Sequence, residues 1–160
     1  MLKLYKNDNG TISYWETWDK DSKNALVHWG VIGNKGQSKE VKSGLFKSFK
    51  KEIQQEIDQL IAEGYGVIDT EDHYTLLIEY IVDGMGTLED VEKRYSLENL
   101  MNEVLGWTGL GHSDGGSIGS GTMEVCCLVV DFEIAKQVIE KALQDTQFAN
   151  YSRIYDENEM

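Results

Sequence analysis

The stretch Val27-His28-Trp29-Gly30-Val31-Ile32-Gly33-Asn34-Lys35-Gly36-Gln37 decides the fold of the first part of the chain. Its apolar and β-branched residues predict a strand over residues 25–32. The glycines that follow predict a tight connection with positive φ, over residues 33–36. Before this stretch, residues 2–5 and 11–18 predict a hairpin around the turn-forming residues 7–10.

A helix is predicted directly after the tight connection. Apolar residues recur there at spacings of three and four, and Gly64 stands where a glycine commonly ends a helix. The apolar positions are Phe46, Phe49, Ile53, Ile57, Leu60 and Ile61. We therefore expect a small twisted antiparallel sheet that carries one long amphipathic helix.

The stretch over residues 27–37 resembles the central strand and turn of the WGR domain family. That family places Trp-Gly-Arg-x-Gly-x-x-Gly-Gln on a strand that enters a turn, after an aromatic hairpin and before a helix that ends in Gly-Tyr. The matching residues outside the motif are Tyr14, Trp15, Trp18, Phe46, Phe49, Gly64 and Tyr65. The resemblance covers roughly the first 67 residues, and Val31 replaces the namesake arginine. WGR domains of poly(ADP-ribose) polymerases contact DNA and neighbouring domains, so the resemblance implies a binding module.

A second pattern begins after residues 66–73, which lack apolar periodicity, and we predict two domains, at 1–67 and 74–160. Strands are expected over 74–82, 122–130 and 151–155, with one helix from 88 to 105 and another after Asp131. The glycine-rich residues 106–121 predict short strands around a hairpin-type turn at Asp114-Gly115-Gly116. The order βαββαβ is that of a ferredoxin-like sandwich, so the whole chain is predicted to be α+β.

The formal net charge of the 160-residue chain is -13, and it is unevenly divided. Residues 1–70 carry 10 lysines and 10 acidic residues, whereas residues 71–160 carry 5 basic and 18 acidic residues. The whole chain should repel nucleic acid and anionic membranes, and no stretch is apolar enough to span a bilayer, so no membrane partner is expected. The absence of a secretory h-region and the adjacent Cys126 and Cys127 predict a reducing, cytoplasmic location.

The leading hypothesis is a non-enzymatic binding or regulatory protein, in which a WGR-like module is joined to an acidic domain that recognises a basic protein partner. An immunity or inhibitor protein for a basic enzyme fits this description. The acidic residues predicted to meet the partner lie on the helix predicted over residues 88–105. They are Glu89, Asp90, Glu92 and Glu98.

The alternative is nucleic-acid binding through the WGR-like half, with lysines on phosphates and an exposed tryptophan that stacks on a base. The residues proposed for this role are Trp29, Lys35, Lys39, Lys50 and Lys51. Two simpler interpretations compete with it. Trp29 can pack the sheet against the helix together with Trp15 and Trp18, and the lysines can form a solvated helix face balanced by Glu52, Glu56 and Asp58.

A weaker alternative is a small-ligand sensor or an enzyme that uses the glycine-rich segment, with His112 as acid or base and Asp114 orienting it. The residues of this candidate ligand loop are Gly111, His112, Asp114 and Gly115. The segment contains no lysine or arginine and no complete phosphate-binding motif, which favours a structural hairpin. No spacing of histidines and cysteines predicts a metal site, no cofactor is expected, and Cys127 is predicted to be in the core with Cys126 on the opposite face.

Overall fold

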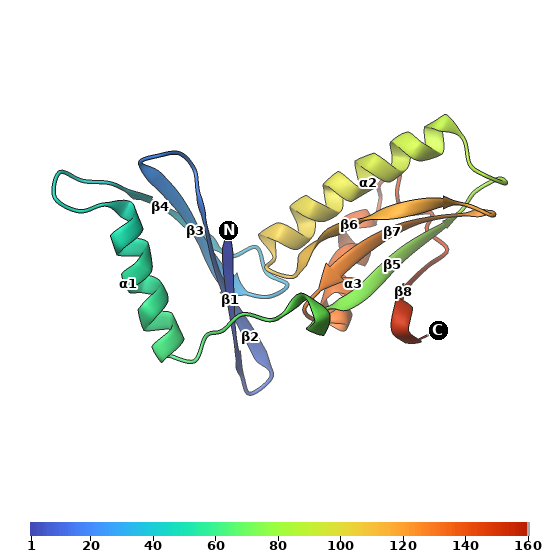
Figure 1. The fold of residues 1–160 in the computed structure, drawn as a ribbon. Coiled ribbons are helices and arrows are strands. Elements are labelled where there is room, and N and C mark those ends of the chain that lie inside the picture. Colours follow the sequence, from blue (N-terminus) through green and yellow to red (C-terminus); the bar gives the residue numbers. More distant parts are fainter. Residues whose placement is uncertain (160) are drawn as a thin grey trace. The chain divides into compact units, whose positions relative to one another are not determined.

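The computed structural model describes residues 1–159 and divides the chain into two compact units, Met1–Ile68 and Asp69–Met160. The division falls inside the segment 66–73 that lacked apolar periodicity. Each unit contains a four-stranded antiparallel sheet, and the predicted α+β class is confirmed (Figure 1). Of the helices in residues 1–159, none combines the length and the apolar character needed to cross a bilayer.

The sheet of the first unit has the order β1-β2-β3-β4. Its strands are β1 (Leu2–Asp8), β2 (Thr11–Asp19), β3 (Asn24–Val31) and β4 (Gln37–Lys42). The predicted hairpin and third strand are confirmed, and Gly33 has the expected positive φ of 87°. The expectation that a helix follows the tight connection directly is wrong, because β4 comes first. This strand was missed because Val41 is its only buried residue.

The helix of the first unit is α1 (Phe49–Ala62), whose N-cap residue is Ser48. Phe46 was predicted to lie on this helix, but it precedes the cap and is fully exposed. Gly64 has a φ of 99° and follows the C-cap residue, as predicted. The hydrogen bonds from Gly64 N to Ile61 O and from Tyr65 N to Leu60 O form a Schellman motif, which satisfies the last helical carbonyls.

The core of the first unit lies between α1 and the sheet face that α1 covers. Trp15 is buried there, and its indole donates to Glu56 of α1 at 3.0 Å. Trp29 is half-buried and packs against the same cluster. The buried members of this core are Leu4, Trp15, Ala25, Val27, Val41, Phe49 and Ile53. Trp15 and Trp29 therefore pack the sheet against the helix, which is the simpler of the two interpretations given for Trp29 above.

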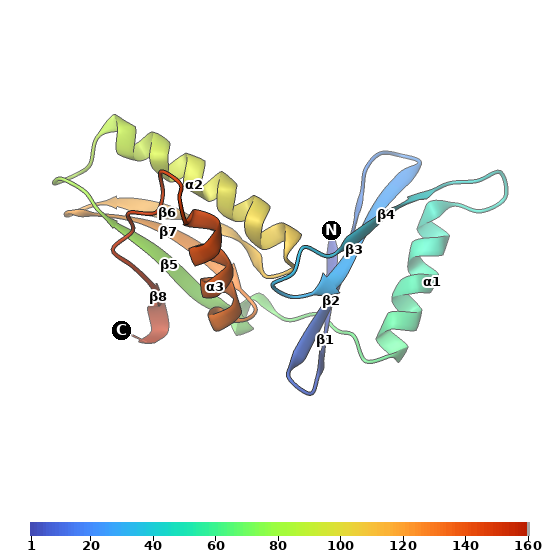
Figure 2. The ribbon, with the colours of Figure 1, turned by 180° about the vertical axis from the view of Figure 1, so that it is seen from behind.

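The second unit has the element order βαββαβ, and its antiparallel sheet has the order β6-β7-β5-β8. Its strands are β5 (Tyr74–Ile81), β6 (Gly111–Gly119), β7 (Thr122–Val129) and β8 (Arg153–Asp156), and its helices are α2 (Leu88–Trp107) and α3 (Phe132–Leu143). The helices contact each other and the sheet. Figure 2 shows α3 in front of the sheet, and Figure 1, from the opposite side, shows the sheet in front of α3.

The glycine-rich segment differs from its prediction. It forms β6, one nine-residue edge strand, and the turn to β7 lies at Ser120 and Gly121, with φ values of 54° and 87°. The predicted turn at Asp114-Gly115-Gly116 is wrong, because the register shifts there, between Ser113 and Gly116, as at a β-bulge. Glycines therefore mark a bulged strand here, which sequence patterns do not distinguish from a loop.

The core of the second unit follows the predicted alternation of β7. Met123, Val125, Cys127 and Val129 are fully buried on the face toward the helices, and Cys126 lies on the other face. Both cysteines are free thiols. Both helices are capped: Thr87 forms a capping box with Asp90, and the side chain of Asp131, which was predicted to precede α3, accepts from Ile134 N.

Candidate functional site

One face of the second unit's sheet is free of helices, and we call it the helix-free face. It consists of the strand positions that alternate with the core positions, together with the β6 residues that the register pairs with them: Leu77, Glu79, His112, Ser117, Glu124, Cys126, Leu128, Arg153 and Tyr155. The register pairs Glu79 with both Glu124 and Arg153, and Leu77 with both Cys126 and Tyr155. Residues from three strands are thus side by side on this surface.

A hydrogen-bonded network occupies the centre of the helix-free face. Glu79 accepts from Ser152 at 2.7 Å and from Arg153 at 2.9 Å, and these bonds lower the pKa of the Glu79 carboxyl. The Tyr155 hydroxyl donates to Glu124 at 2.7 Å, and the guanidinium of Arg153 lies 3.9 Å from the centre of the Tyr155 ring. Burial, followed by the bond to Glu124, raises the pKa of Tyr155 to about 12. The network contains two carboxylates, Glu79 and Glu124, and one cation, Arg153.

Cys126 is the only cysteine on this face, and its surroundings are acidic. Burial raises the pKa of its thiol to about 11, and the charges of Asp114, Glu157 and Glu124 add to the shift. A thiol with this pKa is protonated at neutral pH and is a poor nucleophile. The arrangement favours a binding surface rather than thiol chemistry, because the charges that act on Cys126 are all negative.

The candidate ligand loop lies on β6 and is not a loop. The register pairs His112 with Leu128, so His112 is on the helix-free face. The glycines allow close packing of strands: a Cβ at Gly111 would collide with the Leu128 carbonyl oxygen, and one at Gly116 with the Glu124 carbonyl oxygen. This packing explains the glycines without a bound anion. Asp114 and Gly115 fall in the bulge.

The four acidic residues predicted to meet a partner do not form one free surface. Glu89 and Glu92 are exposed on α2. Asp90 accepts from Thr87 in the capping box, and Glu98 forms an ion pair of 3.0 Å with Arg94. Two of the four carboxylates are therefore engaged in local structure, and the negative charges that act on Cys126 were not predicted from the sequence.

The residues proposed for nucleic-acid binding are also separated. Lys39 lies 5.7 Å from the centre of the half-buried Trp29 ring and binds Glu56 at 2.9 Å, so both side chains have partners in the first unit. Lys35 is in the turn between β3 and β4. Lys50 and Lys51 are in the first turn of α1, which follows the other end of β4.

Sequence reasoning missed a chain of hydrogen bonds in the first unit. His28 Nδ1 lies 2.7 Å from Glu16 Oε1, and His28 Nε2 lies 3.1 Å from the Tyr14 hydroxyl. Because a carboxylate only accepts, Nδ1 donates to Glu16. Burial, and then the charge of Glu16, raises the pKa of Tyr14 to about 12. The phenol is thus protonated at neutral pH. These hydrogen bonds link the side chains of β2 to His28 of β3.

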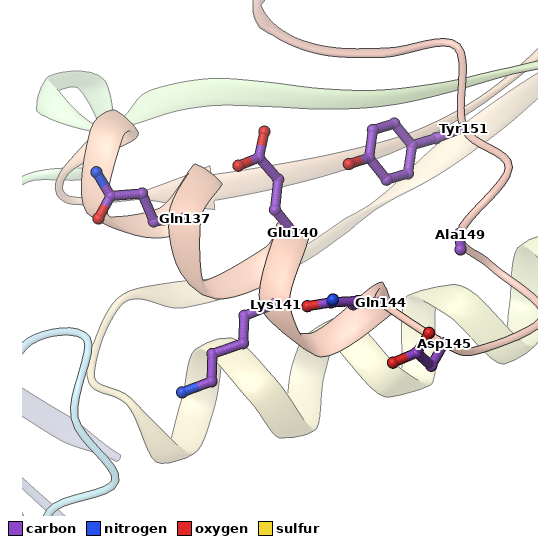
Figure 3. A pocket seen from close by; sticks show the side chains of 7 residues that line it. All are labelled: Gln137, Glu140, Lys141, Gln144, Asp145, Ala149 and Tyr151. Carbon is purple, nitrogen blue, oxygen red and sulfur yellow. The ribbon is translucent and has the colours of Figure 1, made fainter.

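A shallow cavity of about 630 Å³ lies at the C-terminal end of α3. Its lining residues are Gln137, Glu140, Lys141, Gln144, Asp145, Ala149 and Tyr151. Figure 3 shows that these side chains do not converge, because Lys141 extends away from Glu140 and Tyr151. Within residues 1–159, no cluster of three or more histidine, cysteine or acidic residues has a geometry that could hold a metal ion. The chain matches no protein-family model, no curated protein and no solved structure.

Proposed function

We propose that this protein is a non-enzymatic binding protein of the cytoplasm, in which a WGR-like module is joined to an acidic, ferredoxin-like domain that recognises a basic protein partner. The observation that carries the proposal is the helix-free face, where Glu79 and Glu124 are paired by the register and the charges of Asp114, Glu157 and Glu124 act on Cys126. Leu128 and Tyr155 give the same face partly exposed apolar surface. A basic side chain of a partner would meet carboxylates there, and apolar atoms would be buried beside them.

The charge of the second unit supports this proposal. Residues 69–160 contain 19 acidic and 5 basic residues, whereas residues 1–68 contain 9 acidic residues and 10 lysines. A field of one sign accelerates the approach of an oppositely charged protein, mainly through the association rate. This is the behaviour required of an immunity or inhibitor protein that must capture a basic enzyme quickly.

The architecture of the two units supports a WGR-like first unit and a ferredoxin-like second unit. The order βαββαβ with neighbours β6-β7-β5-β8 agrees with a ferredoxin-like sandwich for the second unit. The sheet followed by α1, with Gly64 and Tyr65 at the helix end, agrees with a WGR-like first unit. Two free thiols agree with a reducing compartment.

The experiment compares partner capture by the full-length protein with capture by two charge variants. One variant, Asp114→Asn with Glu124→Gln, removes two charges from the helix-free face. The other, Glu89→Gln with Glu92→Gln, removes two charges from the exposed side of α2. We expect the first pair to weaken binding of the captured basic protein by roughly tenfold or more, mostly through slower association, and the second pair to have a smaller effect.

Equal binding by both variants and by the unmodified protein would overturn the assignment to the helix-free face. Loss of binding in the α2 variant alone would move the partner surface to Glu89 and Glu92. Capture of no basic protein by any form would count against the proposed function itself. Thermal melts of each variant separate loss of binding from loss of folding.

Nucleic-acid binding through the first unit is the second proposal, and it is less well supported because Trp29 and Lys39 pack within the unit. It would depend on Lys35, Lys50 and Lys51 and would be strongly weakened by salt. A mobility-shift assay of the full-length protein with duplex and single-stranded DNA or RNA at low salt tests it. No shift at any protein concentration would reject it.

A further inference from the structure

The connection between β4 and α1 exposes two adjacent apolar side chains. Leu45 is 95% exposed and Phe46 is 100% exposed, whereas Phe49, three residues later, is buried. Figures 1 and 2 both show this connection projecting from the sheet of the first unit. Single exposed apolar residues are common on protein surfaces, but a fully exposed leucine and phenylalanine side by side at a loop tip indicate a contact with something else.

The exposed pair is flanked by lysines in the sequence. Residues 41–51 contain Lys42, Lys47, Lys50 and Lys51, all exposed, and no acidic residue. Lys42 lies 4.0 Å from Glu40, and Lys23, whose carbonyl accepts from Ser43 N, is beside the exposed Asp21. The positive charge of the tip therefore comes from Lys47, Lys50 and Lys51.

We propose that this lysine-flanked tip binds the surface of an anionic lipid bilayer. Leu45 and Phe46 would enter the boundary between headgroups and acyl chains, and the lysines would remain among the anionic headgroups. Their positive charge complements such a surface, and each lysine near it strengthens binding about fivefold. The contact is peripheral and reversible, and it is independent of the partner surface on the second unit.

The size and chemistry of the tip favour a bilayer over other partners. Two side chains bury far less than the roughly 800 Å² per partner of a stable protein interface, whereas a bilayer needs no complementary pocket. Of the two side chains only Phe46 has an aromatic ring that could stack on a base, whereas both Leu45 and Phe46 can enter a bilayer, so the pair favours a bilayer over single-stranded nucleic acid. No membrane partner was expected from the sequence, because the whole chain is acidic and no stretch is apolar enough to span a bilayer. This tip belongs to a unit with one more lysine than acidic residues, and it would not cross the bilayer.

The test measures co-sedimentation of the full-length protein with phosphatidylcholine vesicles and with vesicles that also contain phosphatidylserine. We expect binding at least about tenfold tighter to the anionic vesicles, and weaker at high salt. Leu45→Ser with Phe46→Ser should weaken this binding at least about tenfold. Lys47→Gln with Lys51→Gln should weaken it about 25-fold. All four side chains are exposed, so thermal melts should show unchanged folding.

Two matched controls should bind as the unmodified protein does. Leu88→Ser changes another exposed leucine, at the start of α2. Lys6→Gln with Lys35→Gln removes two charges at the other end of the first unit. Equal binding to both vesicle types, or anionic binding that survives the Leu45 and Phe46 changes, would overturn the proposal. If the unmodified protein binds an oligonucleotide or a soluble protein but not vesicles, the tip would be assigned to that partner instead.

Discussion

Gly36 is held in a space that admits no side chain. A Cβ at this position would collide with the Tyr14 hydroxyl and the Trp29 carbonyl oxygen, and would lie 2.8 Å from His28 Nε2. We expect Gly36→Ala to lower the free energy of unfolding of the first unit by about 1–3 kcal/mol, because two buried polar side chains must shift. Urea denaturation followed by tryptophan fluorescence measures the change.

Gly44→Ala is the control for Gly36→Ala, because nothing lies within 4 Å of a Cβ at Gly44. It should be neutral, or stabilising by a few tenths of a kcal/mol through the unfolded chain. Equal effects of the two substitutions would mean that the packing of Gly36 against Tyr14 and His28 contributes nothing to stability.

The raised pKa of Cys126, about 11, predicts slow reaction with thiol reagents in the native protein. At pH 8 the thiolate fraction is on the order of a hundredfold below that of a free cysteine, although its higher intrinsic nucleophilicity offsets part of this difference. Asp114→Asn removes one of the charges that raise the pKa, so it should accelerate labelling of Cys126. Stopped labelling with mass spectrometry measures both rates. Fast labelling in the unmodified protein would contradict the acidic environment of Cys126.

Glu79 predicts a defined loss of stability in acid. Its pKa lies below the ordinary value of 4.5, first because of its bonds to Arg153 and Ser152. A carboxyl with a lowered folded-state pKa stabilises above its unfolded pKa, and this contribution is lost as the pH falls through the folded pKa. Glu79→Gln should therefore be less stable than the unmodified protein at neutral pH. The difference should shrink below about pH 4.5.

Equilibrium unfolding of the two forms from neutral to acid pH measures this difference. Arg153→Gln removes the first cause of the shift and should reproduce the same pH profile. A difference that stays constant into strong acid would show that Glu79 acts through packing rather than through its charge.

At the scale of elements, hydrophobic patterning located those that bury an apolar face. β3, β5, β7, α2 and α3 follow their predicted positions within a few residues. β4 and β6 are edge strands. One has a single buried side chain and the other has four glycines in nine residues, so neither produces the alternation on which strand prediction depends.

The sites were harder to predict than the elements, for a related reason. The carboxylates of the helix-free face are brought together by register, because Glu79 pairs with Glu124 across β5 and β7. Register is a long-range property that local spacing does not contain. The ion pair of Glu98 with Arg94 is different, because it is an i,i+4 pair on α2, and local helical spacing would have predicted it.

The edge strand β6 is protected by two side chains of α2. Asn102 accepts from Ser113 N at 2.9 Å, and Arg94 donates to Gly116 O at 3.1 Å. A free edge strand presents unpaired backbone groups to other chains. Asn102→Ala should therefore cost about 1 kcal/mol of unfolding free energy and increase concentration-dependent association, measured by light scattering.

Asn99→Ala is the matched control, because Asn99 is an exposed asparagine one turn earlier on α2. It should change neither stability nor association. Unaltered association of the Asn102 variant would show that the twist and the bulge of β6 protect this edge without help from α2.

At the scale of the whole molecule, the two units should respond differently to salt. The second unit carries 14 more acidic than basic residues, and the first unit carries one more lysine than acidic residues. Like charges destabilise a compact state, and salt screens them. Trp15, Trp18 and Trp29 are in the first unit and Trp107 is in the second, so fluorescence of a Trp107→Phe variant reports on the first unit alone, and circular dichroism reports on both. Added sodium chloride should raise the free energy of unfolding of the second unit, followed by circular dichroism, by roughly 1 kcal/mol. It should leave the free energy of unfolding of the first unit, followed by fluorescence, nearly unchanged. Equal shifts of both transitions would mean that the charge is balanced across the units in the folded protein, and would weaken the case for electrostatic capture of a basic partner.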